Sequence, residues 1–550
     1  MFPRHGDTVV LCGRISTALK VPDGGTSGHI VTYDGNAASY DQRATNATIT
    51  NFSRVAGYSS FYIYSKEYVT VKNVKIDWNY TSEMGSSMDN VWGLRIQNSN
   101  NIIIDSADIS ETHNGIAIHD NSYNIRIVKS IINKIAESGI YISRYSSSNH
   151  PHDITIGGKY EDGNTVKNCT YKTRWDNNRV GYDIRLGPDV ENITISYNHL
   201  YSDTEYHGMS AILVHSCQNI LIEYNTIHDH QSFNHRPAIS VKGEERSALA
   251  YNIVIRYNKI YNEKSDSNSY VGTTKAILFS GNWKHAYVYG NYISSCGGGI
   301  NANFAYWINP PTHSDGVNPG NMHIWSNVIY NTSGTGISIG GAWQGTDLIS
   351  DVFIVNNTLY RVALSTQSKT GAGISNSLTD TQDYNINIKN NIIMDARIEA
   401  NDQFTLYSEP SLDRFTENNT YFISNTTYNE KLKSKYSNEE IENPLFLSTN
   451  KGALLLSENS PCKDSGLSIV GPTNVPADVV SLAGEINYED ALDPVKTDWT
   501  TIPPRVYKLK QSDYGAGWEK GAYVYVTNSS DTRLRMSLSK PLNISVSPVN

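Results

Sequence analysis

The chain has 550 residues, too many for one ordinary compact core, so the sequence predicts either several domains or a repeat architecture that grows along one axis. Hydrophobic residues make up 39% and charged residues 18%, a balance that argues against disorder and against a charge-rich helical protein. The formal net charge of −9 argues against nucleic acid as a partner.

The first 60 residues contain two strand-like segments, TVVLCGRI and HIVTYDG. Because the open end of a stacked sheet must be protected, residues 1–60 are expected to form an N-terminal cap. The opening residues lack the apolar stretch of a signal peptide. We expect a secreted, extracellular protein whose signal was removed ahead of Met1.

A motif recurs about every 22 to 40 residues from roughly residue 60 to residue 400. Its first half is a small residue followed by alternating apolar residues, which is typical of a strand with one face in and one face out. It occurs as WGLRIQ from Trp92, NGIAIH from Asn114, SGIYIS from Ser138, GYDIRL from Gly181, SAILVH from Ser210, PAISVK from Pro237, KAILFS from Lys275, GGINAN from Gly298, TGISIG from Thr335 and AGISNS from Ala372.

The second half of the motif follows a short turn and is a strand that closes on asparagine. The closing residues are Asn198, Asn225, Asn258, Asn291, Asn327, Asn357 and Asn391. A side-chain amide both donates and accepts, so equivalent asparagines stacked about 4.8 Å apart can bond each other and the turn backbone.

These features predict an all-β right-handed parallel β-helix of about ten or more rungs over residues 61–425. A helical solenoid would need a 3.6-residue period, and a propeller would need about four strands in each regular blade. The repeats resemble those of right-handed β-helix carbohydrate-active proteins, which include pectate-lyase-like and chondroitinase-B-like polysaccharide lyases and several glycoside hydrolase families. The resemblance implies an enzyme that degrades a polysaccharide.

The repeat stops near residue 425, and residues 426–550 are predicted to form a tail that packs on or caps the helix. The segments SPCKDSG and GWEKGAYVYV are similar to the SPAxDxG and DIGAYE segments of secreted bacterial β-helix proteins. Glu519, Lys520 and Val524 depart from that pattern.

Outward residues of successive first-half strands should form two columns along the helix. The second outward position gives Gln97, His119, Ser143, Arg185, His215, Lys242, Ser280, Asn303, Gly340 and Ser377, and the first gives Arg95, Ala117, Tyr141, Asp183, Leu213, Ser240, Leu278, Asn301, Ser338 and Ser375. Titratable groups concentrate on a few rungs, as active-site groups do.

Elimination on a uronic acid polymer needs a base, a cation to stabilise the enolate and an acid for the leaving oxygen. Lys242 is the candidate base and Arg185 the candidate cation. The candidate proton donors are Tyr141, His119 and His215. Three of these side chains could also have no catalytic role. Lys242 could simply be a solvated surface lysine, and His119 and His215 could simply form hydrogen bonds with loop backbone.

In chondroitinase-B-like lyases a base lysine on this strand has an arginine on the next rung and calcium-binding acids shortly before it. Lys242 matches the lysine, but Ser280 occupies the next rung, and His235 and Arg236 precede Lys242. No metal ligands are therefore assigned, and calcium is unsupported as a cofactor. The five cysteines show no CxxC spacing and indicate neither a zinc site nor a disulfide scaffold; they are Cys12, Cys169, Cys217, Cys296 and Cys462.

Residues on the strand ends and loops beside these columns are candidates for binding the sugar chain. They are Trp283, Trp307, Trp343, Asn303 and Glu244. The tryptophans have the alternative of packing against the helix.

Two other functions stay open. A glycoside hydrolase would need two carboxyl groups, about 5 to 5.5 Å apart for a retaining enzyme or about 6.5 to 9.5 Å apart for an inverting one. Asp183 is the outward candidate, and the loop candidates are Asp120, Asp189, Asp203, Glu205, Glu244 and Glu245. A non-catalytic adhesin or tailspike would use the same helix to bind glycans, although no coiled-coil heptads indicate a trimer. In all three cases we expect a monomer with a polysaccharide or oligosaccharide partner and no membrane association.

Overall fold

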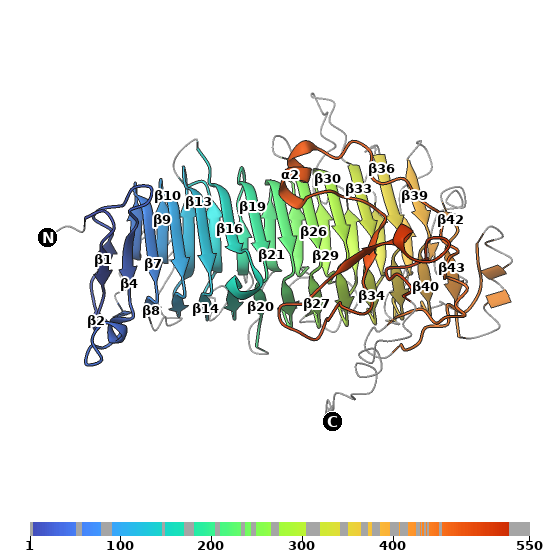
Figure 1. Ribbon diagram of the computed structural model, residues 1–550, viewed down its shortest axis with the longest axis horizontal. Helices are drawn as coiled ribbons and strands as arrows, with labels where there is room; N and C mark the ends of the chain where they lie inside the picture. Colours follow the sequence, from blue (N-terminus) through green and yellow to red (C-terminus); the bar gives the residue numbers. More distant parts are fainter. Residues whose placement is uncertain are drawn as a thin grey trace.

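A computed structural model describes residues 4–50, 58–78, 91–145, 149–169, 181–203, 210–232, 237–243, 249–265, 274–303, 320–340, 350–364, 372–376, 385–396, 406–407, 416–424, 429–430, 432–433, 436, 439–449 and 454–526. Within these residues the chain winds through three long parallel sheets, contributing one strand to each sheet per turn. Figure 1 shows the strands stacked side by side along one axis. The parallel β-helix predicted from the repeat is confirmed.

The first sheet contains β1 (Thr8–Val10), β4 (Val31–Asp34), β7 (Glu67–Lys72), β10 (Asn100–Asp105), β13 (Tyr123–Val128), β16 (His152–Gly157), β19 (Glu191–Ser196), β22 (Gln218–Glu223), β26 (Ala250–Arg256), β30 (Trp283–Tyr289), β33 (Gly320–Trp325), β36 (Ser350–Val355), β39 (Ile386–Lys389) and β42 (Thr416–Glu417). The second sheet contains β2 (Arg14–Ile15), β5 (Thr48–Ile49), β8 (Lys75–Asp77), β11 (Asp108–Ser110), β14 (Ile131–Asn133), β17 (Thr165–Lys167), β20 (His199–Tyr201), β23 (Thr226–His228), β27 (Lys259–Tyr261), β31 (Tyr292–Ser294), β34 (Val328–Tyr330), β37 (Thr358–Tyr360), β40 (Ile392–Met394) and β43 (Thr420–Phe422).

The third sheet carries the outward columns and contains β3 (Leu19–Lys20), β6 (Ser59–Tyr64), β9 (Trp92–Gln97), β12 (Asn114–His119), β15 (Ser138–Ser143), β18 (Tyr182–Leu186), β21 (Ser210–His215), β25 (Ile239–Lys242), β29 (Ile277–Ser280), β32 (Ile300–Asn303), β35 (Ile337–Gly340), β38 (Ile374–Asn376) and β41 (Leu406–Tyr407). Two short strands, β24 (Gln231–Ser232) and β28 (Lys264–Ser265), pair with each other shortly after β23 and β27 of the second sheet. The described helices are α2 (Ala477–Ala483) and the 3-10 turns η1 (Ala37–Ser39), η3 (Tyr160–Asp162) and η8 (Gln511–Asp513). Within the described residues no helix is long and apolar enough to span a membrane.

The interior of the helix is one continuous stack of apolar side chains. The register pairs Ile96 with Ile118 and then Ile118 with Ile142. Farther along, Val214 pairs with Val241 and Val241 with Phe279. The inward residues of these strands belong to a single buried cluster, which includes Ile96, Ile118, Ile142, Val214, Val241, Phe279 and Ile339. The inward and outward faces predicted from the alternation are confirmed.

Asparagines at the turn after the first sheet form a hydrogen-bonded ladder. The side-chain nitrogen of Asn225 donates to Asn258 Oδ1 at 3.0 Å, and that of Asn258 donates to Asn291 Oδ1 at the same distance. The backbone N–H of Asn225 also donates to Asn258 Oδ1. The ladder begins earlier than predicted, at Asn164, and ends later, at Asn419, whose side-chain amide donates to Glu439. Neighbouring rungs are therefore locked in register, as predicted.

Residues 8–49, within the region assigned to an N-terminal cap, already contribute the first strands of all three sheets. β1 pairs with β4, β2 with β5 and β3 with β6. The apolar residues that line this end include Leu19, Val21 and Phe61. The rungs thus begin near residue 8 rather than near residue 61.

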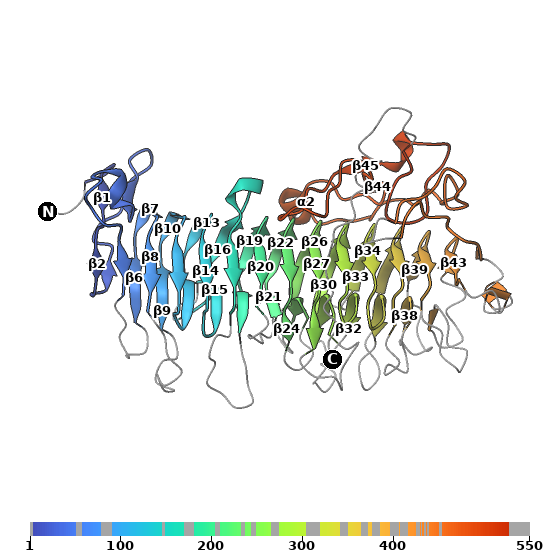
Figure 2. The same cartoon turned by 90° about the horizontal axis from the view of Figure 1, so that it is seen from below.

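The C-terminal segment, residues 454–526, runs back along the outside of the helix and covers outward residues of the first and second sheets. Figure 2 shows it lying along one side of the strands from β22 to β39. Helix α2 contacts β22 and β26, and β44 (Asp490–Leu492) pairs with β45 (Lys508–Lys510) in a small antiparallel sheet. A second apolar cluster holds the segment in place, with Tyr488 packed edge-on against Trp325, which in turn stacks on Tyr289. This segment therefore packs on the helix, which is one of the two roles predicted for the tail.

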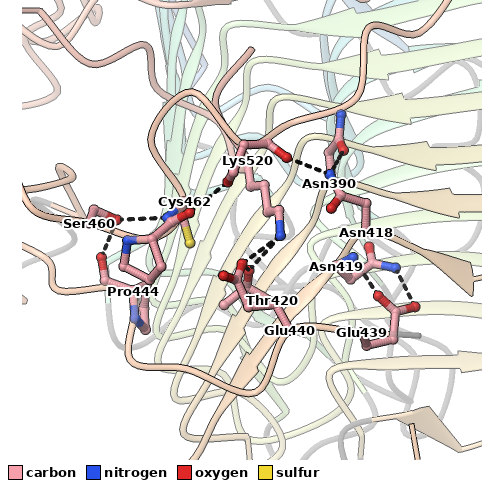
Figure 3. Close-up of polar contacts among 12 residues, drawn as sticks. Asn390, Asn418, Asn419, Thr420, Glu439, Glu440, Pro444, Ser460, Cys462 and Lys520 are labelled. Atoms are coloured by element: carbon pink, nitrogen blue, oxygen red, sulfur yellow. Dashed lines mark hydrogen bonds and ion pairs between the residues drawn. The ribbon is translucent and has the colours of Figure 1, made fainter. Parts of the chain in front are cut away.

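Lys520 explains one departure from the secreted-protein pattern, because it forms an ion pair at the last rung. Its side chain is 2% exposed, and its Nζ lies 2.6 Å from Glu440 Oε2. Thr420 Oγ1 donates to the same carboxylate oxygen at 2.9 Å. Figure 3 shows this group between the tail and the end of the helix, with Cys462 beside it. The backbone N–H of Lys520 donates to the Cys462 carbonyl at 2.9 Å.

Replacing Lys520 by alanine is expected to destabilise the protein by about 3 kcal/mol, because it leaves the Glu440 carboxylate half-buried without its cation. Urea unfolding followed by circular dichroism measures the loss. The matched control is Lys433→Ala, which breaks an exposed pair with Glu430 and should cost less than about 1 kcal/mol. Equal losses for the two variants would contradict a structural role for the buried pair.

Candidate functional site

The outward columns of the third sheet are present, but one predicted member is in the wrong column. Arg185 pairs with Tyr141 on one side and Leu213 on the other, so it belongs to the first outward column with Arg95. His215 and Lys242 pair directly in the second column. The predicted single column of Arg185, His215 and Lys242 is therefore wrong.

The error has a physical origin in strand β18. A slip of two residues keeps the same face outward, so the apolar alternation alone cannot detect it. The other guide is the small residue at the strand entrance, which is glycine at Gly115 and Gly139 and alanine at Ala211. In β18 this position holds Asp183, so the small residue that marks the strand entrance, and with it the register, is missing from the sequence.

Asp183 is therefore not an outward residue but lies inside a corner of the helix. It is 2% exposed, and its Oδ2 lies 2.9 Å from His230 Nε2. The other ring nitrogen of His230 lies 2.9 Å from Glu263 Oε1, and both partners are similarly buried. Burial raises the pKa of Asp183, and despite burial the flanking carboxylates raise the pKa of His230 to about 10. Asp183 is engaged in this pair, so its predicted role as an outward carboxylate is wrong.

The stabilising effect of His230 should depend on pH. Because its pKa is raised in the folded state, its contribution is complete below the unfolded value of about 6.5 and is lost as pH rises towards 10. The difference in free energy of unfolding between wild type and His230→Gln should accordingly shrink between pH 6.5 and 10. Denaturant titrations across this range measure it; a difference that grows with pH would contradict a charged imidazolium between two carboxylates.

A cluster of cationic, aromatic and amide side chains lies on the outer face of the third sheet. We call it the Arg95 face, and it consists of Tyr62, Trp92, Arg95, Gln97, His119, Asp120, Tyr141 and Tyr145. The Arg95 guanidinium lies over three rings, 4.2 Å from the centroid of Trp92, 4.6 Å from Tyr145 and 5.3 Å from Tyr62. Such stacking of the flat face of the guanidinium on aromatic rings holds the cation in one position.

His119 lies beside Arg95 and shares its aromatic neighbours. Its Nδ1 donates to the Ser143 carbonyl at 3.1 Å, which leaves Nε2 as the unprotonated nitrogen. Nε2 is buried and has no hydrogen-bond partner among the described residues. Burial, followed by the charge of Arg95, lowers the pKa of His119 to about 4. At neutral pH the ring is therefore an uncharged base in a fixed orientation.

Hydrogen bonds tie the rest of the Arg95 face together. The Tyr62 hydroxyl donates to Gln97 Oε1 at 2.6 Å, and Gln97 Nε2 donates to Asp120 Oδ2 at 2.6 Å. The backbone N–H of Tyr145 donates to Asp120 Oδ1 at 2.8 Å. Tyr145 is 46% exposed, and its ring covers His119 at a centroid distance of 5.3 Å. Tyr145 is thus the outermost of these rings.

Arg185 continues the basic face three rungs from Arg95. Its guanidinium lies 4.8 Å from the centroid of Tyr141 and pairs with Glu137 at 3.1 Å. Glu137 also accepts a hydrogen bond from Asn114 at 3.4 Å. Arg185 therefore already has a carboxylate neighbour in the protein.

His215 and Lys242 lie on the next two rungs. His215 is half-buried, whereas Lys242 is exposed to solvent.

Sequence reasoning placed Arg95 in an outward column but gave it no role, and it overlooked Trp92, Tyr145 and Tyr62. The signal was present in the alternating tyrosines of SSFYIY, which lie one rung before Arg95.

Of the predicted sugar-binding residues, Trp283 is wrong. It is fully buried in the main apolar cluster and packs edge-on against Phe279 at a centroid distance of 5.5 Å. Trp307, Trp343 and Glu244 lie outside the described residues, as does the side chain of Asn303.

Loop carboxylates are engaged where they are described. Asp189 pairs with Arg144 at 3.3 Å, and Asp203 accepts from Asn168 at 2.8 Å, while Glu205 and Glu245 lie outside the described residues. Within the part of the chain that the structure describes, no group of three or more metal-ligating side chains is found.

No family model matches the sequence, and no curated protein matches it. Among solved structures, a mannuronic acid specific polysaccharide family 6 lyase from human gut microbiota shares 11% identity, with 79% of this chain and 89% of that chain covered and a TM-score of 0.43. The likeness is one of fold. A mannuronan C-5 epimerase A-module from Azotobacter vinelandii shares 13% identity over 68% and 85% of the chains, with a TM-score of 0.41. PfbA, a surface adhesin of Streptococcus pneumoniae, shares 14% identity over 63% and 86%, with a TM-score of 0.36.

Proposed function

We propose that this protein is an extracellular enzyme that cleaves a uronate-containing polysaccharide by β-elimination at the Arg95 face. The observation that carries the proposal is the neutral, oriented His119 beside the stacked guanidinium of Arg95. A fixed cation is what a uronate carboxylate requires, and a neutral imidazole is what proton removal next to that carboxylate requires. The net charge of −9 makes this local basic face the favoured place for an acidic chain.

The roles follow from the contacts. Arg95 would bind the substrate carboxylate and stabilise the enolate that forms. His119 Nε2 would take the proton from the carbon next to the carboxylate, the electron pair would form a carbon–carbon double bond, and the bond to the glycosidic oxygen would break. Tyr141, whose ring lies 5.7 Å from that of His119, would donate a proton to the leaving oxygen. Rotation of the Tyr145 side chain would uncover His119 and Arg95.

Lys242 remains the alternative base. It is exposed on the same face and next to His215, whereas His119 lies under Tyr145. The His119 site is favoured because its base is already uncharged and hydrogen-bonded in one orientation, and because a cation lies beside it.

A screen of acidic and neutral polysaccharides tests the reaction. Each is incubated with the protein while ultraviolet absorbance of an unsaturated product and new reducing ends are recorded together. Elimination gives both signals on a uronate polymer. Reducing ends without absorbance would replace the proposal by hydrolysis, because hydrolysis forms no double bond. Binding without either signal would replace it by an adhesin.

A further inference from the structure

A cavity remote from the Arg95 face lies between the first sheet and the C-terminal segment. It has a volume of about 460 Å³, and its lining includes Lys284, His285, Asn321, Asp351, Phe353 and Asn385. The strands β30, β33 and β36 form its floor, and residues 473–474 form a wall. It is about seven rungs, or roughly 34 Å, from the rung of Arg95 and on another sheet. The two sites are therefore separate.

The floor of the cavity is the end of an aromatic stack. Tyr287 lies 5.2 Å from His323, and His323 lies 5.0 Å from Phe353, with interplanar angles of 2° and 8°. Tyr287 and His323 are buried, whereas Phe353 is half-buried and lines the cavity. The register partner of Phe353 on the next strand is Asn387, so the aromatic stack ends at Phe353. An apolar ring is thus presented beside polar groups.

The polar groups come from the same corner of successive rungs. His285, Asn321 and Asp351 occupy this corner on three neighbouring strands, each with a positive φ of 55° to 58°. Asn321 bridges His285 Nδ1 and His323 Nε2, both at 2.5 Å, and the side-chain amide of Asn385 donates to Asp351 Oδ1 at 2.8 Å. The bonds fix the directions of these side chains. Imidazole, amide and carboxylate groups therefore follow one another at about 4.8 Å along the cavity.

We propose that this cavity is a non-catalytic binding site for a saccharide unit. Sugar hydroxyls both donate and accept hydrogen bonds, which suits amides beside a carboxylate and an ammonium, and the C–H face of a sugar ring suits the ring of Phe353. The volume lies within the range of about 300 to 1,000 Å³ for small-molecule sites. The negative charge of Asp351 would repel a multiply charged anion such as a phosphate, whereas the positive charge of Lys284 could pair with a single carboxylate.

The site does not depend on the reaction at the Arg95 face. It would hold a distant part of the same glycan chain on a long, rigid protein. Such a second contact raises the effective concentration of a long chain at the first site but leaves short chains unaffected.

Calorimetric titration tests the site, with tetrasaccharides of mannuronate, galacturonate and neutral glucose as probes. The titrated protein carries His119→Ala, so that the probes stay intact. Adding Phe353→Ala should weaken binding of at least one probe by about tenfold or more. The matched control is Tyr261→Ala, because Tyr261 is also the half-buried last ring of a three-ring stack, with Tyr201 and His228, on the second sheet. This control should bind as tightly as the parent.

Three results would overturn the inference. One is that no tetrasaccharide binds the parent; another is that Phe353→Ala binds every probe unchanged. The third is that Tyr261→Ala weakens binding equally, which would show a general loss of structure. Phe353-dependent binding by a protein that cleaves no polysaccharide would leave the inference standing while the proposed reaction fails, so the two failures are distinguishable.

Discussion

Replacing His119 by glutamine is expected to lower kcat on the uronate substrate by about 10² to 10⁴-fold. Glutamine keeps a hydrogen-bonding side chain at this position but cannot take up the proton. In the wild type, kcat/KM should fall as the pH drops through an apparent pKa of about 4, because protonation of His119 removes the base. Steady-state kinetics from pH 3.5 to 8 measures both effects.

Lys242→Ala is the decisive comparison for this result, because Lys242 is the base predicted from the sequence. It lies on the same sheet and is exposed, so its truncation should leave the fold intact. If His119 is the base, Lys242→Ala keeps most of its turnover. Loss of turnover in Lys242→Ala, with full turnover in His119→Gln, would move the base to Lys242.

The largest effect on stability is expected for Asn258→Ala, at about 3 to 5 kcal/mol, because each buried polar group left without its partner costs about 1 to 3 kcal/mol. The Asn258 amide donates to the Ile222 carbonyl at 2.9 Å and to Asn291 at 3.0 Å. Its Oδ1 accepts from both the backbone and the side chain of Asn225. Truncation breaks the ladder between three rungs at once.

Urea unfolding measures this loss, and Asn387→Ala provides the control. Asn387 is an asparagine within β39 of the first sheet rather than at the turn after it, and its amide donates to Asn385 at the surface. Its replacement should cost less than about 1 kcal/mol. Similar losses for the two variants would show that the ladder does not stabilise the helix.

The fold was predictable because two independent signals agree on it. The two-residue alternation identifies the strands, and the asparagine at one phase of each repeat identifies the turn. Asn164 and Asn419 were not assigned to the ladder, although both continue it. Asn164 is separated from its strand β16 by an insertion that contains η3, and Asn419 follows β42, which is only two residues long.

The candidate site was less predictable, because its chemistry depends on register and on partners far apart in sequence. Arg185 was assigned two positions away from its place in the column since a slip of two preserves the alternation. Trp283 follows a loop in sequence, yet it is the first residue of β30 and turns inward. His230 and Glu263 are separated from Asp183 by 47 residues or more along the chain, and no local pattern unites them.

The backward course of the C-terminal segment has a consequence for cooperativity. In a solenoid each rung contacts its two neighbours, so unfolding can proceed from either end one rung at a time. Here Lys520 is fastened at β43 and α2 rests on β22 and β26, so one segment bridges rungs that do not touch each other. The last rung cannot fray without detaching a chain that also covers rungs far upstream. Arg505 of the same segment also lies 4.8 Å from the ring of Tyr160, in η3 between β16 and β17. Rungs β16 to β43 should therefore open as one unit in hydrogen exchange, while the rungs before β16 open separately.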